Sequence, residues 1–190
     1  MRQDVTIAAI GGKAPRIHPS AFIAPGCRIV GDVEIGADAS IWYNCVIRGD
    51  VNRVVIGARS NVQDGTVIHC DGPDRIQPDP RHSEGFPTLI GEDVLIGHMA
   101  MLHGCTIHDR GFVGLSTTVM NGCVIESDAM LAAGALLTPG KRIGARQLWG
   151  GRPAAFMREL TDSALAGMQQ GVAHYVANAR AHRQALSPPA

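Results

Sequence analysis

Three histidines have a spacing that could support metal chemistry. His69 directly follows Ile68, His103 directly follows Leu102, and His98 lies five residues before His103. Neutral imidazole is a common ligand of zinc and related divalent ions. Three histidines around a metal ion with one open water position form a catalytic zinc site. These residues therefore predict a metal site, provided that the fold brings them together.

A six-residue repeat is the element that must position these side chains. Aliphatic residues recur every six positions, with a three-residue insertion after Ile47, a longer insertion at about 70–88 and one five-residue step after Leu102. The 19 anchors are Ile17, Ile23, Ile29, Ile35, Ile41, Ile47, Ile56, Val62, Ile68, Ile90, Ile96, Leu102, Ile107, Val113, Val119, Ile125, Leu131, Leu137 and Ile143. A helix needs apolar spacing of three and four, and a flat strand needs a period of two. A period of six instead predicts an all-β fold, a parallel β-helix shaped as a triangular prism over residues 12–150.

The composition agrees with a narrow prism and excludes several classes of function. The chain is 45% hydrophobic but only 4% aromatic, as expected for a core of small and branched aliphatic residues. Its 17 basic and 17 acidic side chains give a net charge of zero, which argues against a nucleic-acid partner. The sequence has no membrane-spanning apolar run and no signal-peptide pattern, so a cytoplasmic location is expected. Five cysteines without a CxxC pair argue against a disulfide framework and a thiolate zinc site.

The last part of the chain, residues 151–186, has a different pattern. It is predicted to be a C-terminal extension followed by an amphipathic helix that packs along the prism, because apolar residues recur there at a spacing of three to four. This stripe consists of Leu165, Met168, Val172, Tyr175, Val176 and Ala179. Binding of a separate partner by this helix is the less favoured interpretation.

The register of the repeat places the polar residues on the prism. Strands three apart in sequence stack on one side, about 4.8 Å from each other. Arg48, His69 and His103 each follow an anchor and form one column, whereas Asp64 and His98 stack on another side. If three prisms met around a threefold axis, three imidazoles could gather at each interface. The same docking could pair Arg48 of one chain with Asp64 of another.

Two segments that carry these residues resemble the γ-class carbonic anhydrases. They are IRGDVNRVVIGARSNVQDGTVIHC at 47–70 and IGEDVLIGHMAMLHGCTI at 90–107, with the motifs RGD, NVQDG and GHxxxxHGC in order. The resemblance extends from about residue 12 to residue 183. It implies a left-handed β-helix and a homotrimer that binds zinc, with iron(II) or cobalt as other metals. It also implies that His69 and His103 come from one subunit and His98 from its neighbour.

The resemblance further implies reversible hydration of CO2 to bicarbonate by a metal-bound hydroxide at the trimer interface. Gln63 would orient the nucleophile and Asn61 would support Gln63. The implied polar network between subunits consists of Arg48, Asp50 and Asp64.

The sequence departs from the most active members of that family at the proton-transfer positions. Those members carry a glutamate after the RxD segment and a second glutamate soon after the first histidine. The corresponding places here hold Val51 or Asn52, and Asp71-Gly72-Pro73. Substitute proton shuttles in the insertion include Asp71 and Glu84, with Asp74 and His82 nearby. A correct metal site with weak or no hydratase activity is therefore one expectation.

Three other functions stay open from the sequence. Hexapeptide acyltransferases share the repeat, and His82 could serve as their loop base. A zinc-dependent CoA-thioesterase is a related possibility. The third is a non-catalytic trimeric scaffold stabilised by metal at its interfaces.

Overall fold

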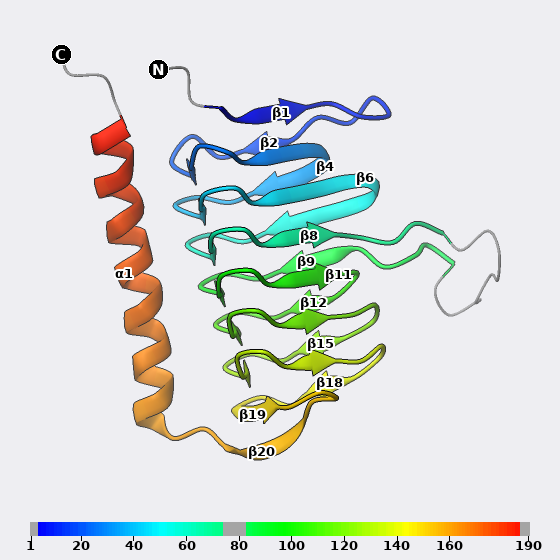
Figure 1. Cartoon of the computed structure of the whole chain (residues 1–190), viewed down its shortest axis with the longest axis vertical. Helices are drawn as coiled ribbons and strands as arrows, with labels where there is room; N and C mark the ends of the chain where they lie inside the picture. Colours follow the sequence, from blue (N-terminus) through cyan, green and yellow to red (C-terminus); the bar gives the residue numbers. More distant parts are fainter. Residues whose placement is uncertain (1–3, 74–82, 187–190) are drawn as a thin grey trace.

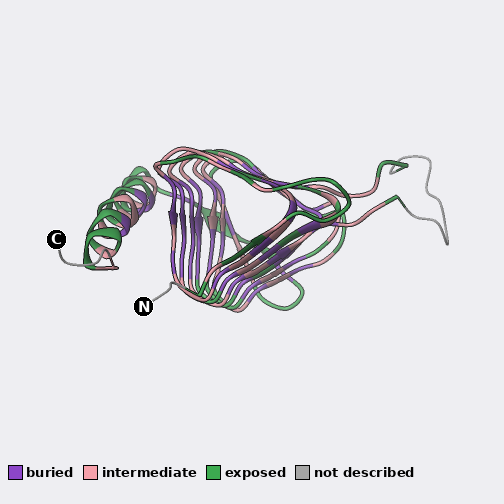
Figure 2. Ribbon diagram, turned by 90° about the horizontal axis from the view of Figure 1, so that it is seen from above, coloured by how far each residue is buried: buried purple, intermediate pink, exposed green. Residues whose placement is uncertain are grey.

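The computed structural model describes residues 4–73 and 83–186. In this part the chain winds as a left-handed solenoid of short strands with a triangular cross-section, and one helix lies along its outside (Figures 1 and 2). The strands are β1 (Thr6–Ala8), β2 (Arg16–Ile17), β3 (Phe22–Ile23), β4 (Arg28–Ile35), β5 (Ser40–Ile41), β6 (Val46–Ile56), β7 (Asn61–Val62), β8 (Val67–His69), β9 (Thr88–Ile90), β10 (Leu95–Ile96), β11 (Met101–His103), β12 (Thr106–Ile107), β13 (Phe112–Val113), β14 (Thr118–Val119), β15 (Val124–Ile125), β16 (Met130–Leu131), β17 (Leu136–Leu137), β18 (Arg142–Ile143), β19 (Gln147–Gly150) and β20 (Ala155–Glu159). The helix is α1 (Asp162–Leu186).

The strands form two sheets that make up the three sides of the prism. The 8-stranded sheet, ordered β20-β19-β16-β13-β10-β7-β5-β3, is one side. The 12-stranded sheet covers the other two sides, because β4 and β6 are long enough to continue around a corner. Its β6 pairs with β8 through Val46 and Ile47, and with β9 through its last three residues. All pairings between coils are parallel, as the repeat predicted.

The core consists of stacked aliphatic side chains with small residues at the corners. The anchors from Ile29 to Ile143 are at most 2% exposed, and Cys27, Cys45 and Cys123 fill inward corners beside alanines and threonines. All five cysteines are buried and unpaired. Burial raises the pKa of the Cys70, Cys105 and Cys123 thiols, so these side chains behave as small neutral fillers. A core of this kind explains the low aromatic content.

One corner of the prism carries charges that alternate from coil to coil. It lies where each coil enters the 8-stranded sheet. Six charged residues with a positive φ occupy this corner and are called the corner ladder: Asp38, Arg59, Asp93, Arg110, Asp128 and Arg146. Within it, Arg59 pairs with Asp93 at 2.6 Å and Arg110 pairs with Asp128 at 2.8 Å. Each ion pair joins two consecutive coils.

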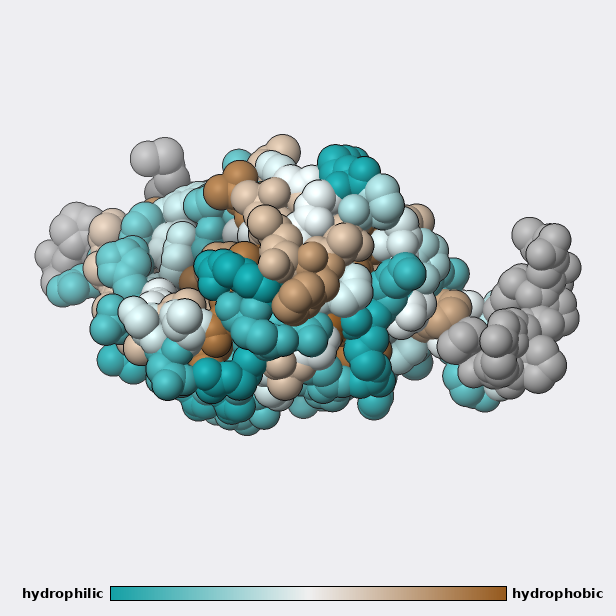
Figure 3. Space-filling model, turned by 90° about the horizontal axis from the view of Figure 1, so that it is seen from below, coloured by the Kyte–Doolittle hydropathy of each residue, from teal (hydrophilic) through white to brown (hydrophobic). Residues whose placement is uncertain are grey.

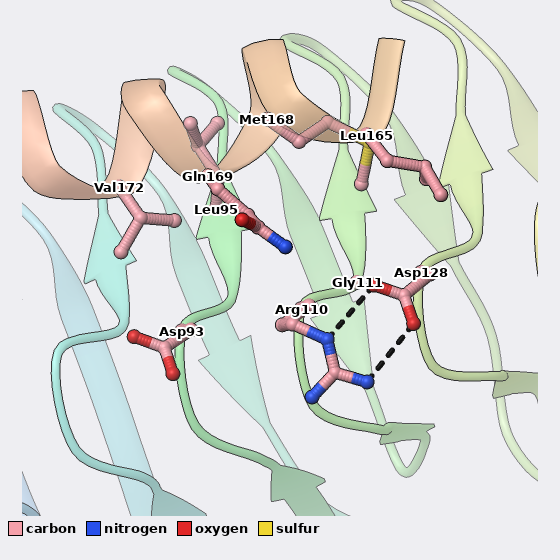
Figure 4. Close-up of a pocket in the computed structure, with 9 residues that line it drawn as sticks. All are labelled: Asp93, Leu95, Arg110, Gly111, Asp128, Leu165, Met168, Gln169 and Val172. Carbon is pink, nitrogen blue, oxygen red and sulfur yellow. Dashed lines mark hydrogen bonds and ion pairs between the residues drawn. The ribbon is translucent and has the colours of Figure 1, made fainter. Parts of the chain in front are cut away.

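Helix α1 lies beside this ladder and covers part of the 8-stranded sheet. Its buried residues are Met168, Val172 and Ala179. Figure 4 shows Leu165, Met168 and Val172 on the side of the helix that faces the strands, next to the Arg110–Asp128 pair. The Thr161 hydroxyl caps the helix by accepting a hydrogen bond from the Ala164 N–H at 3.2 Å.

Two ion pairs connect the ends of the helix to the ends of the ladder. Near its beginning, Asp162 pairs with Arg146 at 2.6 Å. Near its end, Arg180 lies 3.9 Å from Asp38. The helix therefore continues the alternation of charge at both ends of the ladder.

Each end of the solenoid carries one strand that lies outside the six-residue repeat. Strand β1 pairs with β4 before the first anchor, and β20 folds back antiparallel onto β19. A period of six could not reveal either strand, because neither continues the repeat. Viewed from below, this closing end carries apolar side chains among polar ones (Figure 3), and Phe156 and Met157 of β20 are exposed. The described part of the chain has no helix with the length and apolarity needed to cross a bilayer.

Candidate metal site

His69 and His103 lie side by side on adjacent coils. They end β8 and β11 and are direct partners in the parallel register. His69 Nδ1 faces His103 Nε2 at 3.0 Å. Arg48 continues the same column on β6. Ile47 pairs with Ile68, so Arg48, which follows Ile47, stands opposite His69, which follows Ile68. The structure thus brings together the three residues that the register placed in one column.

A carboxylate on the neighbouring coil holds the outer nitrogen of His69. Asp50 Oδ1 lies 2.9 Å from His69 Nε2, and Arg48 donates to Asp50 Oδ2 at 2.5 Å. Partial burial raises the pKa of the Asp50 carboxyl, but the hydrogen bonds from His69 and Arg48 outweigh this effect, so its pKa lies below the usual value. Burial lowers the pKa of His69, which favours neutral imidazole, the form that binds metals.

An asparagine on the opposite side holds the outer nitrogen of His103. His103 Nδ1 and Asn121 Oδ1 are 2.6 Å apart, and Asn121 Nδ2 donates to Asp71 Oδ2 at 2.7 Å. Gly104 follows His103 with a φ of +56°, and a Cβ there would lie 2.7 Å from Asn121 Oδ1 and 2.6 Å from Phe86 Cβ. The absence of a side chain at Gly104 therefore leaves room for the asparagine.

His98 belongs to a different corner of the prism. It lies in the turn after β10, with its side chain 46% exposed, and its Nδ1 is 2.7 Å from Asp64 Oδ2. The backbone N–H of Tyr43 donates to Asp64 Oδ1 at 3.1 Å and fixes the carboxylate. Within one chain, therefore, Asp64 pairs with His98 and Arg48 pairs with Asp50. The expected pairing of Arg48 with Asp64 between two chains stays a prediction.

Asn61 begins β7, and Gln63 directly follows the end of that strand. Both side chains are buried, and Gln63 Nε2 donates to Asn61 Oδ1 at 3.1 Å. Because the Gln63 nitrogen is used in this bond, the Gln63 oxygen, Oε1, stays available to accept a hydrogen bond. Asn61 Nδ2 is buried without a hydrogen-bond partner among the described residues.

The proton-shuttle candidates lie on the insertion. Asp71 and Phe86 form a two-residue antiparallel bridge at its base, and the Asp71 carboxylate is engaged by Asn121. Glu84 is exposed, and its backbone carbonyl accepts a hydrogen bond from Asn52 Nδ2 at 2.8 Å. Asp74 and His82 lie outside the described residues. A role in proton transfer for Asp71 or Glu84 stays a prediction.

The outer hydrogen bonds decide which nitrogens of the two imidazoles carry protons. Asp50 is an acceptor, so His69 Nε2 carries the proton and Nδ1 presents a lone pair. The Asp71 carboxylate is also an acceptor, so the NH2 group of the Asn121 amide faces it. The Asn121 oxygen then faces a protonated Nδ1 of His103. His103 Nε2 then presents a second lone pair toward the first, at 3.0 Å. Two lone pairs this close require a proton or a cation between them.

The separation fits a metal ion. Two nitrogens at 2.0–2.1 Å from one tetrahedral zinc ion lie about 3.3–3.4 Å apart, close to the observed 3.0 Å. Metal-binding histidines commonly donate their other N–H to a carboxylate or carbonyl, as both do here. Within the described residues of one chain, no three His, Cys, Asp or Glu side chains are grouped to hold a metal ion. A single chain thus presents two of the three predicted histidine ligands together, and the third stands at another corner.

Sequence reasoning missed the contribution of Asn121. A signal was present, because Asn121 lies one coil beyond His103 and one position further along, opposite Gly104, as the Gly122 N–H to Gly104 carbonyl bond of 2.8 Å shows. The prediction followed the column of residues directly after the anchors and stopped at His103.

Comparisons with known proteins identify the family. Residues 14–49 match the bacterial transferase hexapeptide family model. The chain is 41% identical over 184 residues to "Gamma carbonic anhydrase 1, mitochondrial" of Arabidopsis thaliana, which covers 97% of this chain but only 65% of that protein. It is 43% identical over 160 residues to "Probable carbonic anhydrase" of Methanocaldococcus jannaschii, covering 84% of this chain and 93% of that one.

A solved structure of similar sequence has the same hexapeptide-repeat fold. The crystal structure of a hexapeptide transferase family protein from Anaplasma phagocytophilum has 40% identity and a TM-score of 0.84, and the match covers 95% of this chain and 99% of that one. Two relatives from Arabidopsis thaliana and the one from Methanocaldococcus jannaschii are named carbonic anhydrases. With the solenoid and the paired histidines, these matches show that the chain belongs to the γ-class carbonic anhydrase family of hexapeptide-repeat proteins.

Proposed function

We propose that this protein hydrates CO2 reversibly to bicarbonate at a metal site shared between subunits of a homotrimer. The observation that carries the proposal is the pair of facing imidazole nitrogens of His69 and His103, 3.0 Å apart, with the outer nitrogen of each ring hydrogen-bonded. His98 of a neighbouring subunit would be the third ligand. Zinc fits this donor set, and iron(II) or cobalt would fit it as well. When bound, the divalent cation makes water acidic enough to act as a nucleophile near neutral pH.

Each polar residue of the candidate metal site has a definite task in this proposal. Asp50, held by Arg48, orients His69, while Asp64 orients His98 through its Nδ1 and leaves Nε2 for the metal. Gln63, fixed by Asn61, accepts a hydrogen bond from the nucleophilic water and aims it at CO2. A second subunit would also cover exposed apolar side chains beside His98, namely Met99 and, on the next coil, Leu115.

The first test is the metal content of the purified protein together with stopped-flow CO2 hydration on the same sample. Stoichiometric metal with hydration that is lost on chelation is the expected result. His98→Ala should abolish metal binding. His108→Ala is the matched control, because His108 is similarly exposed (48%) and also lies near a carboxylate, Glu126, away from the site. Metal retained in His98→Ala would contradict the proposed ligand set.

Mixed trimers test whether the site is shared. His69→Ala and His98→Ala chains are unfolded together, refolded and assayed for metal. A shared site is intact only where an unmodified His69 meets an unmodified His98, which is about one interface in four for random threefold assembly. Metal at about a quarter of the wild-type level is expected. No recovery on mixing would show that the ligands do not come from different chains.

The same samples separate the alternatives. Binding of CoA or acyl-CoA without a need for metal would favour the acyltransferase class named for the Anaplasma relative. Metal-dependent hydrolysis of an acyl-CoA would favour a thioesterase. Stoichiometric metal without any hydration would favour the metal-stabilised scaffold.

A further inference from the structure

A chain of hydrogen bonds connects the base of the insertion to His103. It begins at Asp71, passes through the side chain of Asn121 and ends at His103 Nδ1, with distances of 2.7 and 2.6 Å. Its two outer members are 50 and 18 residues from Asn121 in sequence. The repeat itself does not require an asparagine here, so the contacts of its amide need an explanation.

The first contact fixes the orientation of the amide. A carboxylate accepts hydrogen bonds, so only the NH2 group of Asn121 can face Asp71. The amide oxygen must then face His103. If Asp71 were absent, the amide could rotate by half a turn and present its NH2 group to the imidazole.

The orientation of the amide decides the tautomer of His103. An oxygen facing Nδ1 requires a proton on Nδ1 and leaves Nε2 as a lone pair directed at His69. An NH2 group facing Nδ1 would instead favour a proton on Nε2, the nitrogen that would bind the metal. The carboxylate of Asp71 thus acts on the ligand nitrogen through two hydrogen bonds.

The bridge at the base of the insertion fixes Asp71. Its backbone exchanges two hydrogen bonds with Phe86, at 2.8 and 2.9 Å. Asn52 Nδ2 also donates to the Asp71 carbonyl at 2.9 Å. Phe86 further lies against Gly104, the residue that leaves room for Asn121. The anchored ends of the insertion therefore contribute directly to the geometry of the site.

We propose that Asn121, oriented by Asp71, is a positioning residue that accepts the Nδ1–H of His103 and so directs His103 Nε2 at the metal position. This inference rests on the proposed metal site. It assigns to Asp71 the task of orienting the Asn121 amide.

The metal affinities of variants at Asp71 and Asn121, including one in which the two residues are exchanged, test the proposal. Zinc and cobalt(II) dissociation constants are measured by competition with a chromophoric chelator. Asn121→Ala and Asp71→Asn should each weaken binding about 10- to 100-fold, the usual effect of losing a partner of a metal-binding histidine. Asn121→Asp should also weaken it, because two carboxylates would face each other.

The double variant Asp71→Asn with Asn121→Asp should recover affinity to within about threefold of the wild type. The amide placed at position 71 would donate to the carboxylate at position 121, which would accept from His103 Nδ1–H as before. A role in packing alone predicts no such recovery. Asn178→Ala is the matched control, since it removes an exposed asparagine–histidine contact of 2.9 Å to His174 on helix α1. Thermal melting identifies any variant that fails to fold.

Long-range 1H–15N NMR of the metal-free wild-type protein gives an independent readout. His103 Nδ1 should carry a proton, because it faces the Asn121 oxygen, and Asp71→Asn should lower the population of Nδ1–H. A His103 Nδ1 without a proton in the wild-type protein would overturn the proposal, whether or not the variants fold. Wild-type metal affinity in Asn121→Ala, or a double variant no tighter than the single ones, would overturn it as well. Failure of the wild-type protein to bind any metal would instead refute the proposed function.

Discussion

Gly104→Ala should be far more damaging than the same substitution at Gly140. The two glycines occupy the same corner of the solenoid, two coils apart, with φ of +56° and +70°. Alanine costs about 1–2 kcal/mol in this backbone region at either position. At Gly140 a Cβ would meet nothing within 4 Å, so no further cost is expected there.

At Gly104 the new Cβ would meet two groups. Phe86 Cβ lies 2.6 Å and Asn121 Oδ1 2.7 Å from its ideal position, so both must retreat by roughly 1 Å to reach normal contact distances. Such overpacking costs about 1–3 kcal/mol beyond the backbone strain. The retreat of Asn121 would also stretch its bond to His103, so metal affinity should fall about 10- to 100-fold.

Thermal melting and zinc competition on the two variants test this prediction. Since about 1 kcal/mol corresponds to about 2–4 °C in a chain of this size, Gly104→Ala should melt roughly 2–12 °C below Gly140→Ala. Gly140→Ala should bind zinc as the wild type does. Equal melting temperatures together with equal zinc affinities in the two variants would refute the reasoning.

Three further predictions concern the core, the helix and the pH dependence. Ile125→Ala should lower the free energy of unfolding by about 2–5 kcal/mol in urea, and Ile125→Val by only about 0.5–1.5 kcal/mol, because Ile125 is fully buried; equal losses would contradict a close-packed core. Thr161→Ala should cost about 1 kcal/mol through loss of the helix cap, measured in the same way, and an unchanged midpoint would show that the cap is dispensable. Burial raises the pKa of Cys105, so above the unfolded thiol pKa of about 8.5 the unfolded chain releases a proton that the folded chain keeps. The free energy of unfolding should therefore fall by about 1.4 kcal/mol per pH unit from this thiol alone. Urea unfolding at several pH values should show a smaller fall with pH for Cys105→Ala than for the wild type. An equal fall with pH in the two proteins would show that the thiol ionises in the folded protein.

The periodicity of the sequence was sufficient to predict the fold and part of the site. A six-residue period determines which residues point inward, so each residue directly after an anchor must point outward on a known side. The period alone therefore places His69 and His103 on adjacent coils. The position of His98 at another corner followed from the same register.

The second layer of the site could not be predicted in this way. The contact of Asn121 with Asp71 depends on a corner turn at Gly104 and on the path of an insertion that does not follow the repeat. The one five-residue step after Leu102 also shifts Asn121 by one position relative to the histidine column. Strands β1 and β20 escaped prediction for a related reason, because end strands outside the repeat lack the anchor pattern.

The corner ladder has a consequence for how such a protein can grow or shrink. Repeat proteins change length by duplication or loss of whole coils, but loss of a single coil here would place two like charges on neighbouring coils. It would also leave helix α1 too long. The 18 residues from Asp162 to Arg180 span about 27 Å, and the five coil steps from Asp38 to Arg146 span about 24 Å. Coils should therefore be gained or lost in pairs, each pair accompanied by about six residues of helix.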